Sequence, residues 1–60
     1  MFKINDVVKI KTIENPIWCY AEIRAITGDE AFVAMFHGHD TVKLKDLELV
    51  KRDGVEIKKE

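Results

Sequence analysis

The fold is decided by the stretch Trp18-Cys19-Tyr20-Ala21-Glu22-Ile23-Arg24-Ala25-Ile26. In an extended chain, Cys19, Ala21 and Ile23 lie on one face, and the larger aromatic and charged side chains lie on the other. A helix is the competing interpretation, because Ala, Glu and Arg are good helix formers. The two-residue period and the short length of the stretch favour a strand.

Residues that interrupt regular structure flank this stretch. Pro16 has no amide hydrogen to donate to a strand ladder, and Gly28 lies in a turn-forming segment at the other end. A bulge near Ala25 is expected, because it allows Ile26 to turn inward as well.

The same two-residue period predicts strands on both sides of the stretch. Residues 7–11 and 41–45 alternate aliphatic side chains with lysine or threonine. Residues 31–36 are apolar on both faces, which is typical of a central strand. Turns are expected at residues 27–30 and 37–40.

The most specific local signal is Asp53-Gly54, the dipeptide that two-residue type I′ hairpin turns prefer because both residues need positive φ. Folding the flanks about this turn sets favourable pairs opposite each other. The expected pairs are Arg52–Val55, Lys51–Glu56, Val50–Ile57, Leu49–Lys58 and Glu48–Lys59. A C-terminal β-hairpin over residues 48–60 is therefore predicted, with a frayed tail as the alternative.

Five or six short strands in sixty residues, without a clear helix, predict an all-β domain. A small, partly open barrel is the economical architecture, because curling the sheet creates a core and leaves few exposed edges. We expect one domain over residues 1–60, with the barrel in residues 1–50 and the hairpin as its extension. The inward side chains are expected to be Val8, Ile10, Ala21, Ile23, Ile26, Phe32 or Val33, Phe36, Val42, Leu44, Leu47 and Val50.

The composition excludes several classes of protein. Ten Lys and Arg residues against eleven Asp and Glu residues give a net charge of -1, so the positive field of a dedicated nucleic-acid binder is missing. A hydrophobic share of 47% is too high for a disordered chain. The longest apolar run, residues 31–36, is too short to span a membrane. The single cysteine cannot form an internal disulfide, so a cytoplasmic location is expected.

Three segments of the sequence carry a family resemblance. Residues 2–8 read FKINDVV, residues 18–23 read WCYAEI and residues 42–47 read VKLKDL. They resemble the "hydrophobic–x–x–G–D–x–V" opening, the "W–Y–x–A–x–V" second strand and the "V–x–x–x–D–L" close of SH3-like barrels of the Tudor and KOW type. Asn5 stands where that family usually has glycine, and asparagine tolerates similar turn geometry. The resemblance covers residues 2–50 and implies an SH3-like (Tudor-like) barrel.

The resemblance also implies a binding module rather than an enzyme. Readers of methylated lysine or arginine in this family hold the cation in a cage of four aromatic side chains at the barrel rim. The positions that match the cage here are Thr12, Cys19, Phe36 and His39. Only Phe36 is a good cage wall, although a one-residue slip in the second strand would bring a neighbouring aromatic ring to the rim.

Aromatic side chains point to a surface that binds a partner. Trp, Tyr and Arg dominate the energetics of protein interfaces, and they occur together in residues 18–24. The predicted partner-binding residues are Trp18, Tyr20, Arg24, Phe36 and His39. The alternative is an aromatic pair that merely shields the flank of the barrel. The partner is another protein or a second copy of the chain, and a homo-oligomer is expected because so short a chain builds a small core.

Alternating lysines provide the second functional hypothesis. If the first and fourth strands lie together, their outer faces form a basic stripe that binds RNA or DNA through phosphates. The residues concerned are Lys9, Lys11, Lys43 and Lys45. Lysines that protect sheet edges from aggregation are the alternative, and nearby carboxylates neutralise much of the field.

Metal binding and catalysis have little support in the sequence. His37, His39, Asp40 and Cys19 are metal-ligand types, but the chain has neither a C-x-x-C motif nor a second His/Cys pair. Glycine-rich phosphate loops and paired catalytic carboxylates are also missing. We therefore expect no metal, no cofactor and no enzymatic activity.

Overall fold

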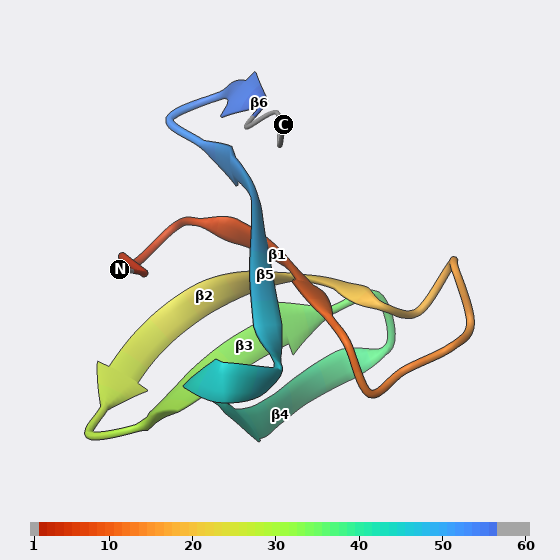
Figure 1. The fold of residues 1–60 in the computed structure, drawn as a ribbon, viewed down its shortest axis with the longest axis horizontal. Helices are drawn as coiled ribbons and strands as arrows, with labels where there is room; N and C mark the ends of the chain where they lie inside the picture. Colours follow the sequence, from red (N-terminus) through yellow and green to blue (C-terminus); the bar gives the residue numbers. More distant parts are fainter. Residues whose placement is uncertain (1, 57–60) are drawn as a thin grey trace.

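A sheet of short antiparallel strands makes up the molecule. The computed structural model describes residues 2–56 of the chain, and these residues form six strands and no α-helix (Figure 1). The elements are β1 (Val7–Ile10), β2 (Tyr20–Thr27), β3 (Glu30–Met35), β4 (Gly38–Lys43), the 3-10 helix η1 (Leu44–Asp46), β5 (Leu47–Arg52) and β6 (Val55–Glu56). The predicted all-β class is confirmed, and residues 20–26 of the deciding stretch are strand rather than helix.

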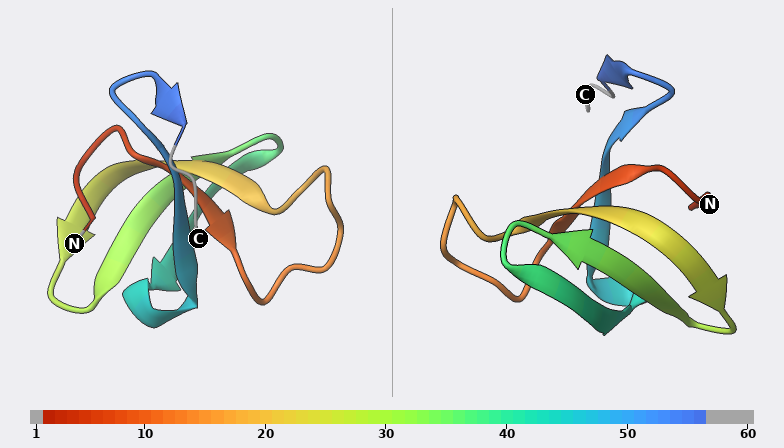
Figure 2. Two further views of the ribbon diagram at one scale, coloured as in Figure 1. Left: turned by 45° about the horizontal axis from the view of Figure 1, so that its top comes forward. Right: turned by 180° about the vertical axis from the view of Figure 1, so that it is seen from behind.

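The sheet curls into a small, partly open barrel. Its strand order is β4-β3-β2-β1-β5-β6, and each neighbouring pair is antiparallel. The strands β2, β3 and β4 form a twisted layer that β5 crosses steeply, while the turn between β5 and β6 projects away from it (Figures 1 and 2). Among the described residues β4 and β6 form the two edges, so the barrel does not close, as predicted.

The alternation of side chains along the strands builds the core. The buried apolar side chains are Val8, Ile10, Cys19, Ala21, Ile23, Ala31, Val33 and Leu47. The half-buried side chains packed against them are Phe2, Ile13, Ile26, Met35, Val42 and Leu44. Most of the predicted inward set is therefore confirmed, although Val50 is only half-buried.

The predicted bulge in β2 is present. The register between β2 and β3 shifts between Ile23 and Ala25, so that Ala25 lies opposite Phe32. Beyond the shift, Ile26 is half-buried against the core. One extra residue in a strand changes which face the following side chains occupy, which is why Ile26 joins the inner face.

Two aromatic residues of the predicted core lie outside it. Phe36 is 78% exposed, because β3 ends at Met35 and Phe36 stands in the following turn. Phe32 is also exposed, since Ala31 and Val33 occupy the inner face on either side of it. Of the two options at this point, Val33 is the inward residue.

The predicted turn at residues 37–40 is wrong in its position. The chain reverses at Phe36 and His37, and His39 already belongs to β4. Gly38, with φ of 144°, allows this early start, because that backbone conformation is costly for other residues.

The predicted strand at residues 41–45 ends early. Lys43 is its last residue, and residues 44–46 form η1. The amide of Leu44 still donates to Asp29 O at 2.8 Å, and the amide of Lys11 donates to Asp46 O at 2.7 Å. The 3-10 turn thus redirects the chain from β4 to β5, beside β1.

An amide at the open edge of the sheet is satisfied locally. The backbone N–H of Thr41 in β4 donates to the side-chain Oδ1 of Asp40 at 2.8 Å. Because the acceptor is the side chain of the preceding residue, the N–H of Thr41 does not need a neighbouring strand as its partner.

The C-terminal hairpin has the predicted turn. Asp53 and Gly54 have φ values of 55° and 78°, the positive pair that a type I′ turn requires. Lys51 lies opposite Glu56, and Arg52 lies opposite Val55. The other three predicted pairs involve residues 57–60, which lie outside the described residues.

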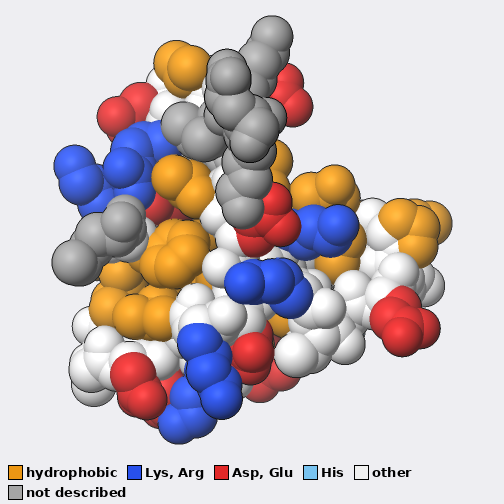
Figure 3. All heavy atoms as spheres, viewed as in Figure 1, with side chains coloured by type: hydrophobic (Ala, Val, Ile, Leu, Met, Phe, Trp, Pro, Cys, Tyr) orange, Lys and Arg blue, Asp and Glu red, His pale blue; other side chains and the backbone are white. Residues whose placement is uncertain are grey.

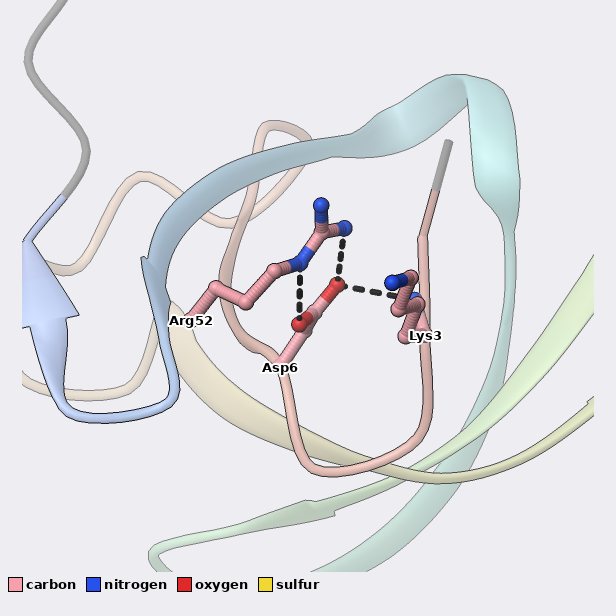
Figure 4. A network of polar contacts seen from close by, with 3 residues as sticks. All are labelled: Lys3, Asp6 and Arg52. Atoms are coloured by element: carbon pink, nitrogen blue, oxygen red, sulfur yellow. Dashed lines mark hydrogen bonds and ion pairs between the residues drawn. The ribbon is translucent and has the colours of Figure 1, made fainter.

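A buried carboxylate joins the N-terminal turn to the end of β5 (Figure 4). Asp6 is only 2% exposed. Its Oδ1 accepts a hydrogen bond from Nε of Arg52 at 3.0 Å, and its Oδ2 accepts one from Nη2 at 2.8 Å. The backbone amide of Lys3 also donates to Oδ2, at 2.8 Å. The sequence indicated only a turn at this position.

The backbone of the same turn is bound to β2. The amide of Asn5 donates to Ile23 O at 2.8 Å, and the amide of Ile23 donates to Asp6 O at 2.9 Å. Asn5 has φ of 78°, which asparagine tolerates better than most residues. Asp6 therefore holds β2 through its main chain and β5 through its side chain.

Acid should weaken this link. The hydrogen bond from Arg52 holds the pKa of Asp6 below its ordinary value of 3.8, although burial acts in the opposite direction. The pKa of Asp6 is lower in the folded state than in the unfolded state, so the ionised carboxylate stabilises the fold fully above pH 3.8. This stabilisation is lost as the pH falls through the pKa of the folded state. We expect the free energy of unfolding to fall more steeply with acid below pH 3.8 in the wild type than in Asp6→Asn.

Urea denaturation at a series of pH values measures this difference. At neutral pH, Asp6→Asn should also be less stable by about 1–3 kcal/mol, the cost of leaving a buried polar group without its partner. If the free energy of unfolding had the same dependence on pH in both proteins, ionisation of Asp6 would not contribute to stability.

The turn between β5 and β6 provides a second prediction. Gly54→Val should lower the free energy of unfolding by about 1–2 kcal/mol, because a β-branched residue resists positive φ. A Cβ at Gly54 would meet no atom within 4 Å, so any loss reflects backbone strain rather than a clash. Gly54→Asn is the matched control and should lose less than half as much in thermal denaturation. Equal stability of the valine variant and the wild type would contradict the hairpin geometry.

Candidate functional site

An aromatic cluster joins the loop before β2 to the turn after β3. The ring centroids of Trp18 and Phe36 are 5.3 Å apart, with an interplanar angle of 71°. The ring of His37 also contacts that of Trp18, with centroids 4.6 Å apart and an interplanar angle of 80°. Both contacts are edge-to-face, the favourable arrangement for aromatic rings. We call Trp18, Phe36 and His37 the aromatic corner.

A shallow pocket opens beside the aromatic corner. Its volume is about 420 Å³, and it is lined by Ile13, Asn15, Trp18 and His37. Most of this lining is apolar, and His37 is its only residue with an ionisable side chain. The pocket can hold an apolar side chain of a partner, with Asn15 as a polar group at its margin.

Local hydrogen bonds shape the loop that carries the pocket. The side-chain Oδ1 of Asn15 accepts from the amide of Ile17 at 2.8 Å, and Asn15 O accepts from the amide of Trp18 at 3.2 Å. The thiol of Cys19 lies 3.6 Å from Pro16 O. These bonds fix residues 15–19 as a turn, so Trp18 is presented in one orientation.

A second ring pair lies on the outer face of the sheet. Phe32 of β3 stacks on His39 of β4, with centroids 5.2 Å apart and an interplanar angle of 4°. Tyr20, at the start of β2, is 47% exposed. Since the neighbours of Phe32 and Tyr20 in the strands are buried, alternation directs both rings outward. The outer face of β2, β3 and β4 is thus rich in exposed rings.

The structure brings some predicted partner-binding residues together. Trp18 and Phe36 are in contact, whereas His39 pairs with Phe32. Arg24 lies on the sheet with its Nη2 3.3 Å from Oε1 of Glu22, rather than in the aromatic corner. The predicted site is therefore spread over the corner and the outer face.

Trp18 does not share a strand with Tyr20, contrary to expectation. β2 begins at Tyr20, and Trp18 belongs to the preceding turn because its amide is bonded to Asn15. Of the four cage positions implied by the family resemblance, one has its ring stacked on Phe32, namely His39. Cys19, one of them, is 1% exposed and faces the core.

Three residues of the site escaped the sequence analysis. Ile13 and Asn15 line the pocket, and His37, an exposed residue of the turn after β3, also contacts the ring of Trp18. A turn of two residues at the end of β3 brings His37 toward Trp18. This contact could be predicted only if the last residue of β3 were known. Their positions depend on contacts between segments far apart in the chain.

The predicted basic stripe does not form on neighbouring strands. Lys9 lies on β1 and Lys43 on β4, and β2 and β3 stand between them in the sheet. The Nζ of Lys43 lies 3.2 Å from Glu30 Oε2 and 3.8 Å from Asp29 Oδ2. The hydrogen bond to Glu30, aided by the charge of Asp29, raises the pKa of Lys43. On the face in Figure 3, Lys and Arg side chains form separate groups with Asp and Glu side chains close to them.

Two structural features are absent from residues 2–56. No group of three or more His, Cys, Asp or Glu side chains there is arranged to hold a metal ion. No helix in the same range has the length and hydrophobicity needed to cross a membrane.

Exposure of the aromatic corner leads to a prediction about stability. Phe36→Ser should change the free energy of unfolding by no more than about 0.5 kcal/mol, the usual limit for an exposed position. Ile23→Ala, in the core, should cost about 2–5 kcal/mol. Urea denaturation of both variants measures the contrast. A large loss from Phe36→Ser would mean that Phe36 serves folding and is not available for binding.

Comparison with known proteins adds no family to this description. No protein-family model, curated protein or solved structure matches the chain.

Proposed function

We propose that the chain is a small, non-catalytic interaction module that binds a protein surface through the aromatic corner and its pocket. The observation that supports this most is the exposure of Phe36, a residue that is 78% accessible although its ring packs on Trp18. Exposed aromatic side chains beside an apolar recess are typical of protein interfaces.

Preorganisation is the physical advantage of this arrangement. The ring of Trp18 contacts two other rings, and its backbone amide donates a hydrogen bond within the preceding turn. A side chain that is already ordered loses little conformational freedom when a partner covers it. Each buried ring then contributes its full apolar area to binding.

The surroundings suit the rim of an interface. Tyr20 extends the aromatic surface along β2, and the ion pair of Arg24 with Glu22 adds polar groups that orient a partner. The single thiol, that of Cys19, is buried and free, which suits a reducing compartment such as the cytoplasm. We therefore place the activity there.

An enzymatic role has less support. The pocket beside Trp18 includes one ionisable residue, His37, and its ring packs on the indole. General acid–base or nucleophilic catalysis requires a second group that accepts or delivers the proton.

Binding of single-stranded nucleic acid remains the second candidate. Lys9 lies directly opposite Tyr20 in the β1–β2 ladder, so a phosphate contact and a stacking ring stand side by side. However, Lys9 also lies opposite Glu48 of β5, and Lys43 is engaged by two carboxylates. The weak positive field favours the protein partner.

Capture of proteins from a cell extract by the immobilised chain tests the proposal. Trp18→Ala and Phe36→Ser should each lose the bound proteins, because they remove the central rings, whereas Val55→Ser should retain them. Val55 is the matched control, since it is 63% exposed and lies on β6. Moderate salt should have little effect on capture.

Fluorescence anisotropy with a labelled single-stranded oligonucleotide tests the second candidate. Binding that falls steeply with salt and is lost in Lys9→Gln would favour nucleic acid. Capture that is equal for the wild type, Trp18→Ala and Phe36→Ser would contradict the proposed function.

A further inference from the structure

We infer that the aromatic corner binds a second copy of the chain, in a two-fold symmetric homodimer that inserts an apolar side chain of each copy into the pocket of the other. This inference rests on the proposed function, because it uses the same surface and specifies the partner.

Protruding and recessed features lie side by side on this surface. Ile17 and Phe36 are 67% and 78% exposed, and both flank Trp18, one through the chain and one through ring contact. Trp18 also forms a wall of the pocket, together with Ile13 and His37. In a two-fold interface the same patch must supply both the inserted side chain and its recess. This patch has both.

The charge pattern also favours a second copy. Residues 12–19 and 34–39 contain a single Asp, Glu, Lys or Arg, namely Glu14, although such residues make up 35% of the chain. Close to a two-fold axis each charge faces its own counterpart on the partner, and like charges facing each other oppose association. A different protein could carry charges complementary to those of the patch, so its binding would not require a patch with so few charged residues. We call residues 12–19 and 34–39 the uncharged patch.

The size of the molecule sets the expected affinity. A standard interface covers about 800 Å² of each partner, which is roughly a fifth of the 4474 Å² of accessible surface here. That is a large share for one patch of so small a molecule. We therefore expect a reversible dimer with a dissociation constant on the order of micromolar, rather than an obligate one.

Sedimentation velocity of the full chain, from low micromolar to near-millimolar concentration, tests the inference. The wild type should change from monomer to dimer over this range. Phe36→Ser and Ile17→Asp should each weaken association by about tenfold or more, because one removes an inserted ring and the other sets a carboxylate against an apolar recess. Val55→Ser, exposed but on β6, should behave as the wild type. Circular dichroism confirms that each variant is folded.

Tryptophan fluorescence shows which surface is used. Trp18 is the only tryptophan of the chain, so its emission reports directly on the uncharged patch. Its emission should shift to shorter wavelength over the same concentrations at which sedimentation detects the dimer. A dimer without a shift in emission, or one that persists in both patch variants, would place the contact elsewhere and overturn the inference.

A wild-type chain that stays monomeric throughout would also overturn it. If capture of other proteins still depended on Trp18 in that case, the proposed function would stand with a different protein as partner. If capture were equally insensitive to Trp18→Ala and Phe36→Ser, both proposals would fail.

Discussion

The buried carboxylate of Asp6 is the interaction on which the rest of the structure depends. A sheet in so short a chain buries few apolar side chains, too few to fix its own curvature. Specific bonds must therefore hold β5 where it crosses the other strands. Asp6 provides them, since its main chain pairs with Ile23 of β2 and its side chain holds Arg52 of β5. The hydrogen bonds between Asp6 and Arg52 join residues 46 positions apart, so they close a loop that contains most of the chain. Burial of the charge is tolerable because every oxygen of the carboxylate is paired.

The strands were predictable because burial on one face imposes a period of two. The sequence therefore predicted the alternation around Ala21 and Ile23, the bulge at Ala25 and the turn at Asp53-Gly54. These features are local, so each can be deduced from neighbouring residues. The Asp6–Arg52 bond is not local, because its partners are 46 residues apart and no spacing rule connects them.

The candidate site was predictable only in part. Trp18 and Phe36 are conspicuous residue types, and their importance follows from composition alone. Their contact depends on where β3 ends, which no periodicity determines because residues 31–36 are apolar on both faces. A one-residue difference in that end decides whether Phe36 enters the core or stands on the surface. The contact of His37 with Trp18 depends on the same strand end.

The amide of Thr41 has a consequence for how copies of the chain can meet. A free edge strand is a template on which other chains can extend a sheet without limit, as happens in fibrils. At β4, however, the carboxylate of Asp40 already occupies that amide and adds a negative charge beside it. An incoming strand must displace this bond, so extension of the sheet is disfavoured at this point of the β4 edge.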